Sequence, residues 1–158
     1  MRVLLVDDEE TLLEFLSKRL LKHGFTVKAA FSGEEAIEVA KEEPYDVAVV
    51  DLKMPGIDGV ETQERLKEIQ PFLQCIVLTA HGSIETALES GQRDAFQYLL
   101  KPVDYDNLVA MIKDAYKKKV DIQETRFREQ VEEIYRSGMG AHGIKKAIGE
   151  LRKIYGIE

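Results

Sequence analysis

The chain contains one cysteine, Cys75, among its 158 residues, so it cannot form an internal disulfide bond. Cys75 lies in an apolar run, where a thiol usually packs as a small core side chain, and a single free thiol is typical of the reducing cytoplasm. No apolar stretch approaches the roughly 20 residues needed to cross a membrane, and the N-terminus does not resemble a secretory signal. We therefore expect a cytoplasmic protein that makes no contact with a membrane.

Two common functional motifs are also missing. The sequence has no Walker-type glycine loop for nucleotide binding. Its histidines, His23, His81 and His142, lack the spacing of metal ligands. His81 alone is of interest, because it follows a candidate site residue, Thr79, by two positions. Neither a nucleotide-hydrolysing domain nor a histidine metal site is expected.

Charge is distributed unevenly along the chain, whose net charge is −7. Residues 1–116 carry 22 acidic and 12 basic side chains, whereas residues 117–158 carry 7 acidic and 10 basic ones. An acidic body is a poor match for nucleic acid, because non-specific binding depends on clustered Lys and Arg that neutralise phosphates. Any DNA-binding role would therefore belong to the tail.

Apolar runs that suit buried parallel strands recur along the first two thirds of the sequence. They occupy residues 3–6, 26–30, 47–50, 75–78 and 96–100, and segments with helical spacing begin near Thr11, Gly33, Asp58, Ser83 and Asp104. The last of these helices places Tyr116 among its inward residues. Strands that alternate with helices through short connections predict an α/β fold, with a doubly wound five-stranded parallel sheet.

Polar residues follow four of the five predicted strands. Asp7 and Asp8 follow the first strand, Asp51 the third, Thr79 the fourth and Lys101 the fifth. Each residue alone has an ordinary explanation, such as an acid near a helix N-terminus, a turn residue or a solvated charge. Because the carboxyl ends of parallel strands meet at one edge of the sheet, we expect all five side chains to converge there.

The chemistry of this set favours phosphoryl transfer. Three neighbouring carboxylates repel one another unless a cation compensates, and hard oxygen ligands favour Mg²⁺ or Mn²⁺. A carboxylate can also act as a nucleophile and form an aspartyl phosphate, whose developing charge needs a metal, an ammonium and a hydroxyl donor. We therefore expect Asp51 to be the nucleophile, Asp7 and Asp8 to hold the metal, and Lys101 and Thr79 to supply the other two groups.

These residues and their surroundings resemble the receiver domains of two-component response regulators. The matching segments are residues 3–9, 49–59, 78–80 and 98–102. The resemblance implies a flavodoxin-like sheet of order 2-1-3-4-5 in a receiver domain at 1–118. It does not cover residues 119–158, which are expected to form a helical tail. Residues 78–87 are further similar to receivers that precede ATP-driven transcriptional activators of the nitrogen-regulation type, although no ATPase sequence follows here.

The resemblance also implies specific roles around the metal. Asp8 and Asp51 would bind Mg²⁺ directly, the backbone carbonyl of Lys53 would be a third ligand, and Asp7 would act mostly through water. The phosphoryl donor would be a phosphohistidine on a sensor histidine kinase or phosphotransfer protein. Such a chain is not an enzyme in the usual sense, because it catalyses only its own phosphorylation and dephosphorylation.

Two further features follow from the same resemblance. A cis peptide bond is expected between Lys101 and Pro102, where it would aim the lysine into the site. Tyr98 matches the aromatic residue that moves inward when the hydroxyl of Thr79 is drawn toward a phosphate. The small side chain of Ala80 would keep the site open to the donor.

The tail is expected to form a helical hairpin. A sparse apolar stripe runs to Tyr135, three glycines interrupt it between 138 and 143, and an amphipathic helix follows at 144–154. One hypothesis is an interaction element that docks on the receiver or on a second copy of the chain. The other is a small DNA-binding unit, which is less favoured because a helix-turn-helix generally needs a third helix and because acids interrupt the basic residues.

The favoured function is thus a phosphorylation-controlled interaction protein that binds either a downstream protein or a second copy of itself. A homodimer would form through the tail and the face made by residues 83–90, 96–100 and the helix after Asp104. A transcription regulator that binds DNA through residues 119–158 is the alternative. A metal-dependent phosphatase is a third possibility, and it is disfavoured because nothing in the sequence resembles a substrate pocket or a second general acid.

Overall fold

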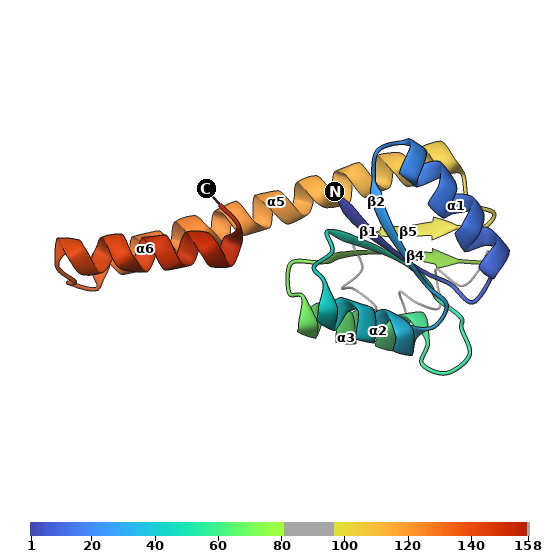
Figure 1. The fold of residues 1–158 in the computed structure, drawn as a ribbon, viewed down its shortest axis with the longest axis horizontal. Helices are drawn as coiled ribbons and strands as arrows, with labels where there is room; N and C mark the ends of the chain where they lie inside the picture. Colours follow the sequence, from blue (N-terminus) through green and yellow to red (C-terminus); the bar gives the residue numbers. More distant parts are fainter. Residues whose placement is uncertain (81–96, 158) are drawn as a thin grey trace. The chain divides into compact units, whose positions relative to one another are not determined.

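The computed structural model describes residues 1–80 and 97–157, and it contains strands and helices in alternation (Figure 1). The elements are β1 (Arg2–Val6), α1 (Glu10–Lys22), β2 (Thr26–Ala30), α2 (Gly33–Glu42), β3 (Val47–Asp51), α3 (Gly59–Ile69), β4 (Gln74–Thr79), β5 (Gln97–Leu100), α5 (Tyr105–Arg136) and α6 (Ala141–Tyr155). The helix expected at 83–90 and the residue His81 lie outside the described residues.

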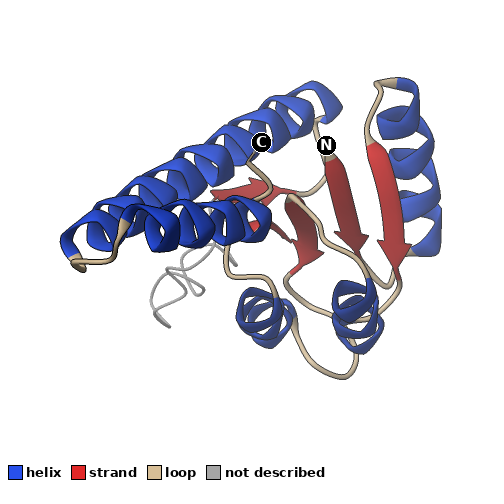
Figure 2. Ribbon diagram, turned by 60° about the vertical axis from the view of Figure 1, so that its left-hand side comes forward, coloured by secondary structure: helices blue, strands red, loops and turns tan. Residues whose placement is uncertain are grey.

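The five strands form one parallel sheet in the order β2-β1-β3-β4-β5, which confirms the predicted doubly wound fold (Figure 2). β1 and β3 are neighbours in the register that pairs Val6 with Val50. β4 lies on the other side of β3, where Asp51 pairs with Leu78. The residues that follow β1, β3 and β4 therefore emerge side by side at one edge of the sheet.

Each face of the sheet carries its own apolar core, because successive strand side chains point to opposite faces. Leu5 and Val49 pack in the core that α1 and α5 cover, and Leu4 and Val50 pack in the core that α2 and α3 cover (Figure 1). Full burial of a leucine or valine contributes about 1.5–3 kcal/mol. Ala115 and Tyr116 were both expected to face inward from α5; Ala115 is buried, whereas Tyr116 is 36% exposed.

Side-chain caps set the starts of α2 and α3. Ser32 accepts a hydrogen bond from the backbone N–H of Glu35 at the start of α2, at 3.1 Å. Asp58 accepts one from Glu61 at the start of α3, at 2.9 Å. Such caps satisfy helix N–H groups that have no partner within the helix, and each typically contributes about 1 kcal/mol. The Asp58 cap fixes where the loop after β3 ends.

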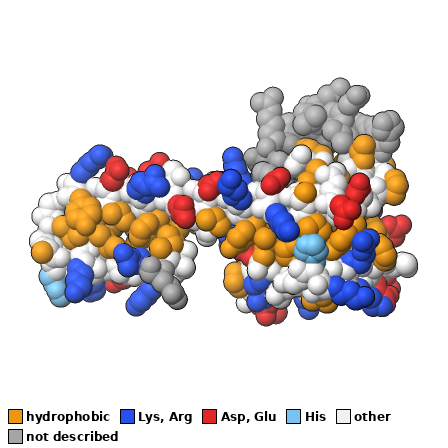
Figure 3. All heavy atoms as spheres, turned by 90° about the horizontal axis from the view of Figure 1, so that it is seen from above, with side chains coloured by type: hydrophobic (Ala, Val, Ile, Leu, Met, Phe, Trp, Pro, Cys, Tyr) orange, Lys and Arg blue, Asp and Glu red, His pale blue; other side chains and the backbone are white. Residues whose placement is uncertain are grey.

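The chain divides into two compact units, Met1–Lys119 and Val120–Glu158, and the single helix α5 continues from the first into the second. In the second unit, the rings of Phe127 from α5 and Tyr155 from α6 meet edge to face with centroids 6.0 Å apart. The predicted C-terminal helical extension is therefore present. Figure 3 shows hydrophobic side chains gathered along one face of this unit. No helix in the described part of the chain is long and apolar enough to span a membrane.

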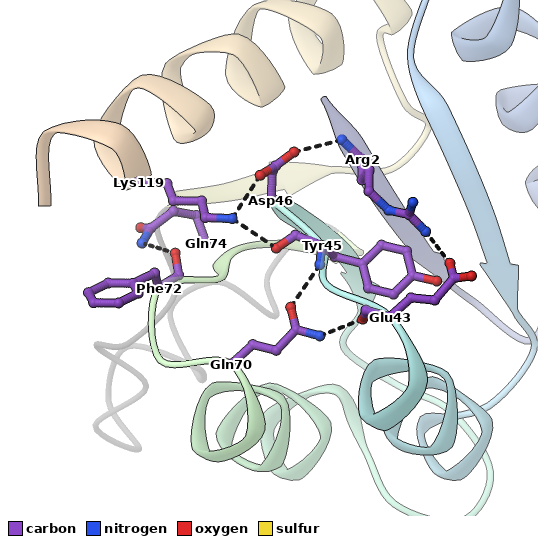
Figure 4. Close-up of polar contacts among 8 residues, drawn as sticks. All are labelled: Arg2, Glu43, Tyr45, Asp46, Gln70, Phe72, Gln74 and Lys119. Atoms are coloured by element: carbon purple, nitrogen blue, oxygen red, sulfur yellow. Dashed lines mark hydrogen bonds and ion pairs between the residues drawn. The ribbon is translucent and has the colours of Figure 1, made fainter. Parts of the chain in front are cut away.

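A polar network fixes the last residue of the first unit. The Nζ atom of Lys119 donates to Oδ1 of Asp46 at 2.7 Å and to the carbonyl oxygen of Tyr45 at 3.2 Å (Figure 4). Asp46 also accepts a hydrogen bond from the backbone N–H of Arg2 at 2.7 Å. Because the Lys119 side chain is only 13% exposed, these bonds hold α5 against the amino ends of β1 and β3, at the edge opposite Asp51.

Candidate functional site

Three carboxylates converge at the carboxyl edge of the sheet, as the sequence predicts. Oxygen atoms of Asp7, Asp8 and Asp51 all lie within 4.8 Å of one another. Asp7 is fully buried and Asp51 is 7% exposed, whereas Asp8 faces solvent. The convergence follows from the register of β1 and β3, because Asp7 and Asp51 each come one residue after the paired residues Val6 and Val50.

Lys101 reaches these acids from the end of β5. Its Nζ atom lies 2.8 Å from Oδ2 of Asp7, 3.3 Å from Oδ1 of Asp51 and 3.8 Å from the carboxylate of Glu9. Its backbone N–H donates to the carbonyl oxygen of Thr79 at 2.8 Å, and the peptide bond between Lys101 and Pro102 is cis. The ammonium therefore lies between the two most buried acids of the cluster.

Burial and mutual repulsion shape the ionisation of the cluster. Burial and, to a lesser extent, the negative charge of Asp7 raise the pKa of Asp51 to about 6, against the opposing effect of the positive charge of Lys101. Burial alone would lower the pKa of Lys101, but its hydrogen bond to Asp7 and the charge of Asp51 outweigh this effect and raise it. At neutral pH, Asp51 is therefore mostly ionised and Lys101 carries its positive charge.

Thr79 and Tyr98 lie on adjacent strands beside this cluster. Thr79 is 1% exposed, and its hydroxyl donates to the carbonyl oxygen of Ala80 at 3.3 Å. In the register of β4 and β5, Thr79 pairs with Leu100 and Val77 with Tyr98, so the side chains of Thr79 and Tyr98 point to the same face of the sheet. Burial raises the pKa of the Tyr98 hydroxyl. The Thr79 hydroxyl is therefore close to the site without bonding to Asp51.

Three residues that sequence reasoning did not identify shape the loop after Asp51. A Cβ atom at Gly59 would lie 2.3 Å from the carbonyl oxygen of Asp51, so only glycine allows this close approach. Gly56 has a φ of 79°, which favours glycine, and Glu34 of α2 accepts a hydrogen bond from the backbone N–H of Ile57 at 3.0 Å. The glycines are a recognisable turn signal, whereas nothing in the sequence connects Glu34 to a loop 23 residues away.

The donor set fits a hard divalent cation. Three carboxylates face one ammonium, so the cluster keeps an excess of negative charge. Carboxylate oxygens are the ligands that Mg²⁺ prefers, and Mg²⁺ usually takes only a few protein ligands. Lys53, which the family resemblance assigns as a carbonyl ligand, lies in the loop that Gly59 and Glu34 hold, and its side chain is exposed.

Comparisons with known proteins agree with this geometry. The sequence pattern of the response regulator receiver domain matches residues 3–113. The Escherichia coli transcriptional regulatory protein GlrR is 39% identical over 82% of this chain, and the E. coli DNA-binding transcriptional regulator NtrC is 33% identical over 78%. The alignments span only 29% of GlrR and 26% of NtrC.

A solved structure also resembles this chain in fold. The response regulator TrrA from Thermotoga maritima, determined in complex with Mg²⁺ and BeF, superposes with a TM-score of 0.64 and 32% identity, over 72% of this chain and 97% of TrrA. The match to NtrC confirms the predicted similarity to receivers of the nitrogen-regulation type. Fold, site and sequence pattern agree, and the chain belongs to the response regulator receiver domain family.

Proposed function

We propose that Asp51 accepts a phosphoryl group from a phosphohistidine on a sensor histidine kinase or phosphotransfer protein. The observation that carries this proposal is the position of Lys101, whose Nζ atom contacts both Asp7 and Asp51 within a cluster of three carboxylates. A structural ion pair would need one acid for one ammonium. The additional acids suit a site that receives a metal and a phosphoryl group together.

In the proposed reaction, a carboxylate oxygen of Asp51 attacks the phosphorus atom of the donor. A bond forms between oxygen and phosphorus, the bond from phosphorus to the imidazole nitrogen breaks, and that nitrogen keeps the electron pair. Asp51 needs no general base, because it is mostly ionised at neutral pH. Lys101 lies 3.3 Å from Oδ1 of Asp51, where its charge can balance the negative charge of the incoming group.

Asp8, Asp51 and the carbonyl of Lys53 would hold Mg²⁺ or Mn²⁺, and Asp7 would contribute through water. When bound, the ion neutralises negative charge on the phosphoryl oxygens. Excess chelator should therefore suppress phosphorylation by orders of magnitude, and Asp8→Ala should weaken metal binding. Full phosphorylation in chelator, or unchanged Mg²⁺ affinity in Asp8→Ala, would contradict this assignment.

We also propose that phosphorylation changes how the receiver, residues 1–118, binds other proteins or itself. The buried hydroxyl of Thr79 would exchange its 3.3 Å bond to Ala80 for a stronger bond to the phosphate, and Tyr98 would follow on the same face of the sheet. Coupling of this kind is usually about 1–3 kcal/mol, which changes an association constant roughly 5- to 150-fold.

Sedimentation with and without beryllofluoride tests this switch. The response should be lost in Thr79→Ala and kept in Cys75→Ala, a substitution on the same strand. If beryllofluoride leaves the association constant of the wild type unchanged, self-association is not the output, and only binding to other proteins remains.

DNA binding by the tail is a second candidate, because GlrR and NtrC are named transcriptional regulators. The basic residues of α6 are Lys145, Lys146, Arg152 and Lys153, against one acid, Glu150. However, no residue of α6 is buried, whereas a helix-turn-helix unit needs a packed core. We therefore favour protein binding. Salt-sensitive DNA binding that requires residues 119–158 in a gel-shift assay would reverse this preference.

Phosphorylation itself is tested with a small donor such as acetyl phosphate and Mg²⁺, followed by intact-mass spectrometry. We expect one added, acid-labile phosphoryl group in the wild type and none in Asp51→Asn. Asp58→Asn is the matched control, because it makes the same change in an exposed cap of the neighbouring loop. Equal labelling of Asp51→Asn and wild type would mean that the nucleophile is another residue. Because the chain acts only on itself, no turnover beyond one equivalent of donor is expected, apart from hydrolysis of its own phosphate.

A further inference from the structure

The tail unit has almost no core of its own. The buried residues of α5 end at Ala115, and α6 has none. Apolar side chains remain on its surface instead, with Tyr135 62%, Met139 48% and Ile154 75% exposed. Two helices of this length gain little stability from propensity alone and normally depend on tertiary packing. Among the described residues, the hairpin therefore leaves much of its apolar surface exposed.

The exposed apolar surface forms two grooves, one along each helix. A groove of about 590 Å³ is lined along α6 by Ile144 and Ile148, and one of about 440 Å³ is lined along α5 by Phe127 and Val131. Tyr135 lines both. The lining residues recur at the three- and four-residue spacing of one helix face, so the two grooves make one continuous apolar face of the hairpin.

The charges that border these grooves have opposite sign on the two helices. Glu124 and Glu132 border the α5 groove, with Arg128 between them, and Lys145 and Arg152 border the α6 groove. Within residues 120–157, one ion pair involves these acids: Arg136 lies 3.5 Å from the carboxylate of Glu132. Across this face, α5 therefore offers mainly acids and α6 offers bases.

We infer that this face binds the same face of a second copy of the chain, so that two hairpins form a four-helix bundle in which α6 packs on α5 of the other copy. The inference deepens the self-association part of the proposed function, but it does not require phosphorylation of Asp51. A two-fold interface places the same patch on both subunits, and this patch is complementary to itself because each copy contributes one acidic and one basic groove.

The order of the charges selects this arrangement over its alternative. The contact between Phe127 and Tyr155 shows that the end of α6 lies beside the start of the tail part of α5. Arg152, three residues before Tyr155, is therefore level with Gln130, three residues after Phe127. Along the helix axis it lies about 3 Å from the level of Glu132 and about 9 Å from the level of Glu124. A two-fold axis along the helices keeps these levels, so Arg152 meets Glu132 of the other copy. With the axis across them, α6 would face α6 and the bases would repel one another.

Sedimentation of the full chain without phosphoryl donor tests the inference. We expect the wild type to dimerise at concentrations on the order of 10–100 µM. Arg152→Glu and Glu132→Lys should each weaken self-association by roughly tenfold or more, because each places like charges together at two symmetric positions. Lys153→Glu is the matched control, because this exposed neighbour of Arg152 does not line either apolar groove, and it should leave dimerisation intact.

Mixing the two variants distinguishes pairing between chains from effects within one chain. In a heterodimer of Arg152→Glu with Glu132→Lys, both contacts regain opposite charges, so the mixture should associate where each variant alone does not. A wild type that stays monomeric at about 100 µM, the upper end of the expected range, would overturn the inference. So would a mixture that stays monomeric, or a Lys153→Glu variant as impaired as Arg152→Glu.

Labelling of Asp51 in the same samples keeps the two proposals apart. A dimer that survives Arg152→Glu, in a chain that still accepts one phosphoryl group, refutes the four-helix bundle and leaves the proposed function intact. A dimer that depends on Arg152, in a chain that Mg²⁺ and donor do not label, refutes only the proposed function.

Discussion

Asp51 should make the metal-free protein less stable at neutral pH, and its replacement by asparagine should raise stability. Burial and the charge of Asp7 raise the pKa of Asp51 from 3.8 to about 6. The native state therefore binds more protons than the unfolded state between about pH 4 and pH 6, and wild-type stability falls as pH rises through this window. The asparagine side chain in Asp51→Asn has the same shape and no charge, so the variant escapes this loss.

The size of the effect follows from the shift in pKa. Each pKa unit corresponds to about 1.4 kcal/mol, so the cost reaches about 3 kcal/mol above pH 7. At pH 5 this cost has only partly developed, because Asp51 is mostly protonated in the native state. The advantage of Asp51→Asn should therefore be roughly 1.5 kcal/mol larger at pH 8 than at pH 5. Lys101 keeps its 2.8 Å contact with Asp7 in both proteins.

Urea unfolding at the two pH values, in chelator, measures this difference directly. Asp58→Asn should change stability by no more than about 0.5 kcal/mol at either pH, because this cap is exposed and asparagine also caps helices. Adding Mg²⁺ should then stabilise the wild type and leave Asp51→Asn unchanged. If Asp51→Asn is less stable than the wild type at pH 8, or if its advantage does not depend on pH, the electrostatic account of the site is wrong.

Other residues of the first unit give three further tests. Gly59→Ala should cost about 1–3 kcal/mol and slow labelling, because its new Cβ would meet the carbonyl oxygen of Asp51 at 2.3 Å; unchanged unfolding and labelling would contradict this. Lys119→Met should lower the free energy of unfolding in urea by about 1–3 kcal/mol. Lys118→Met, at an exposed position of the same helix, should lower it by less than about 0.5 kcal/mol. Equal losses in the two variants would refute the anchoring role of Lys119. Lys101→Met should move the pKa of Asp51 above 6 in an NMR titration, because it removes the cation that lowers this pKa. An unchanged titration would show that Lys101 does not affect the ionisation of Asp51.

The sequence could predict that the candidate site residues converge, because these residues lie at the ends of regular elements. Asp7, Asp51 and Lys101 each follow an apolar run, and the parallel arrangement of such runs brings their carboxyl ends together. No long-range contact had to be known in advance. The alternation of strands and helices likewise predicted the doubly wound fold class, because short right-handed crossovers leave few other topologies, whereas the strand order came from the family resemblance.

The contacts that support the site could not be predicted in this way. Lys117, Lys118 and Lys119 are the same residue type in one run, yet only Lys119 is held by Asp46, a partner 73 positions earlier in the sequence. The hydrogen bond from the backbone N–H of Ile57 to Glu34 likewise joins residues that are far apart in the sequence. Such pairings depend on how the loops pack in three dimensions, and a single sequence carries no periodic signal for them.

The central claim is that Asp51 is the phosphoryl acceptor, and site mapping by mass spectrometry tests it most directly. The wild type is treated with acetyl phosphate and Mg²⁺, the acyl phosphate is reduced with borohydride, and the modified residue is identified in the digested chain. We predict that reduction converts residue 51 to homoserine, with no conversion at Asp7, Asp8 or Asp58. Conversion at one of those acids instead, or no modification of a folded protein that has bound Mg²⁺, would contradict the claim.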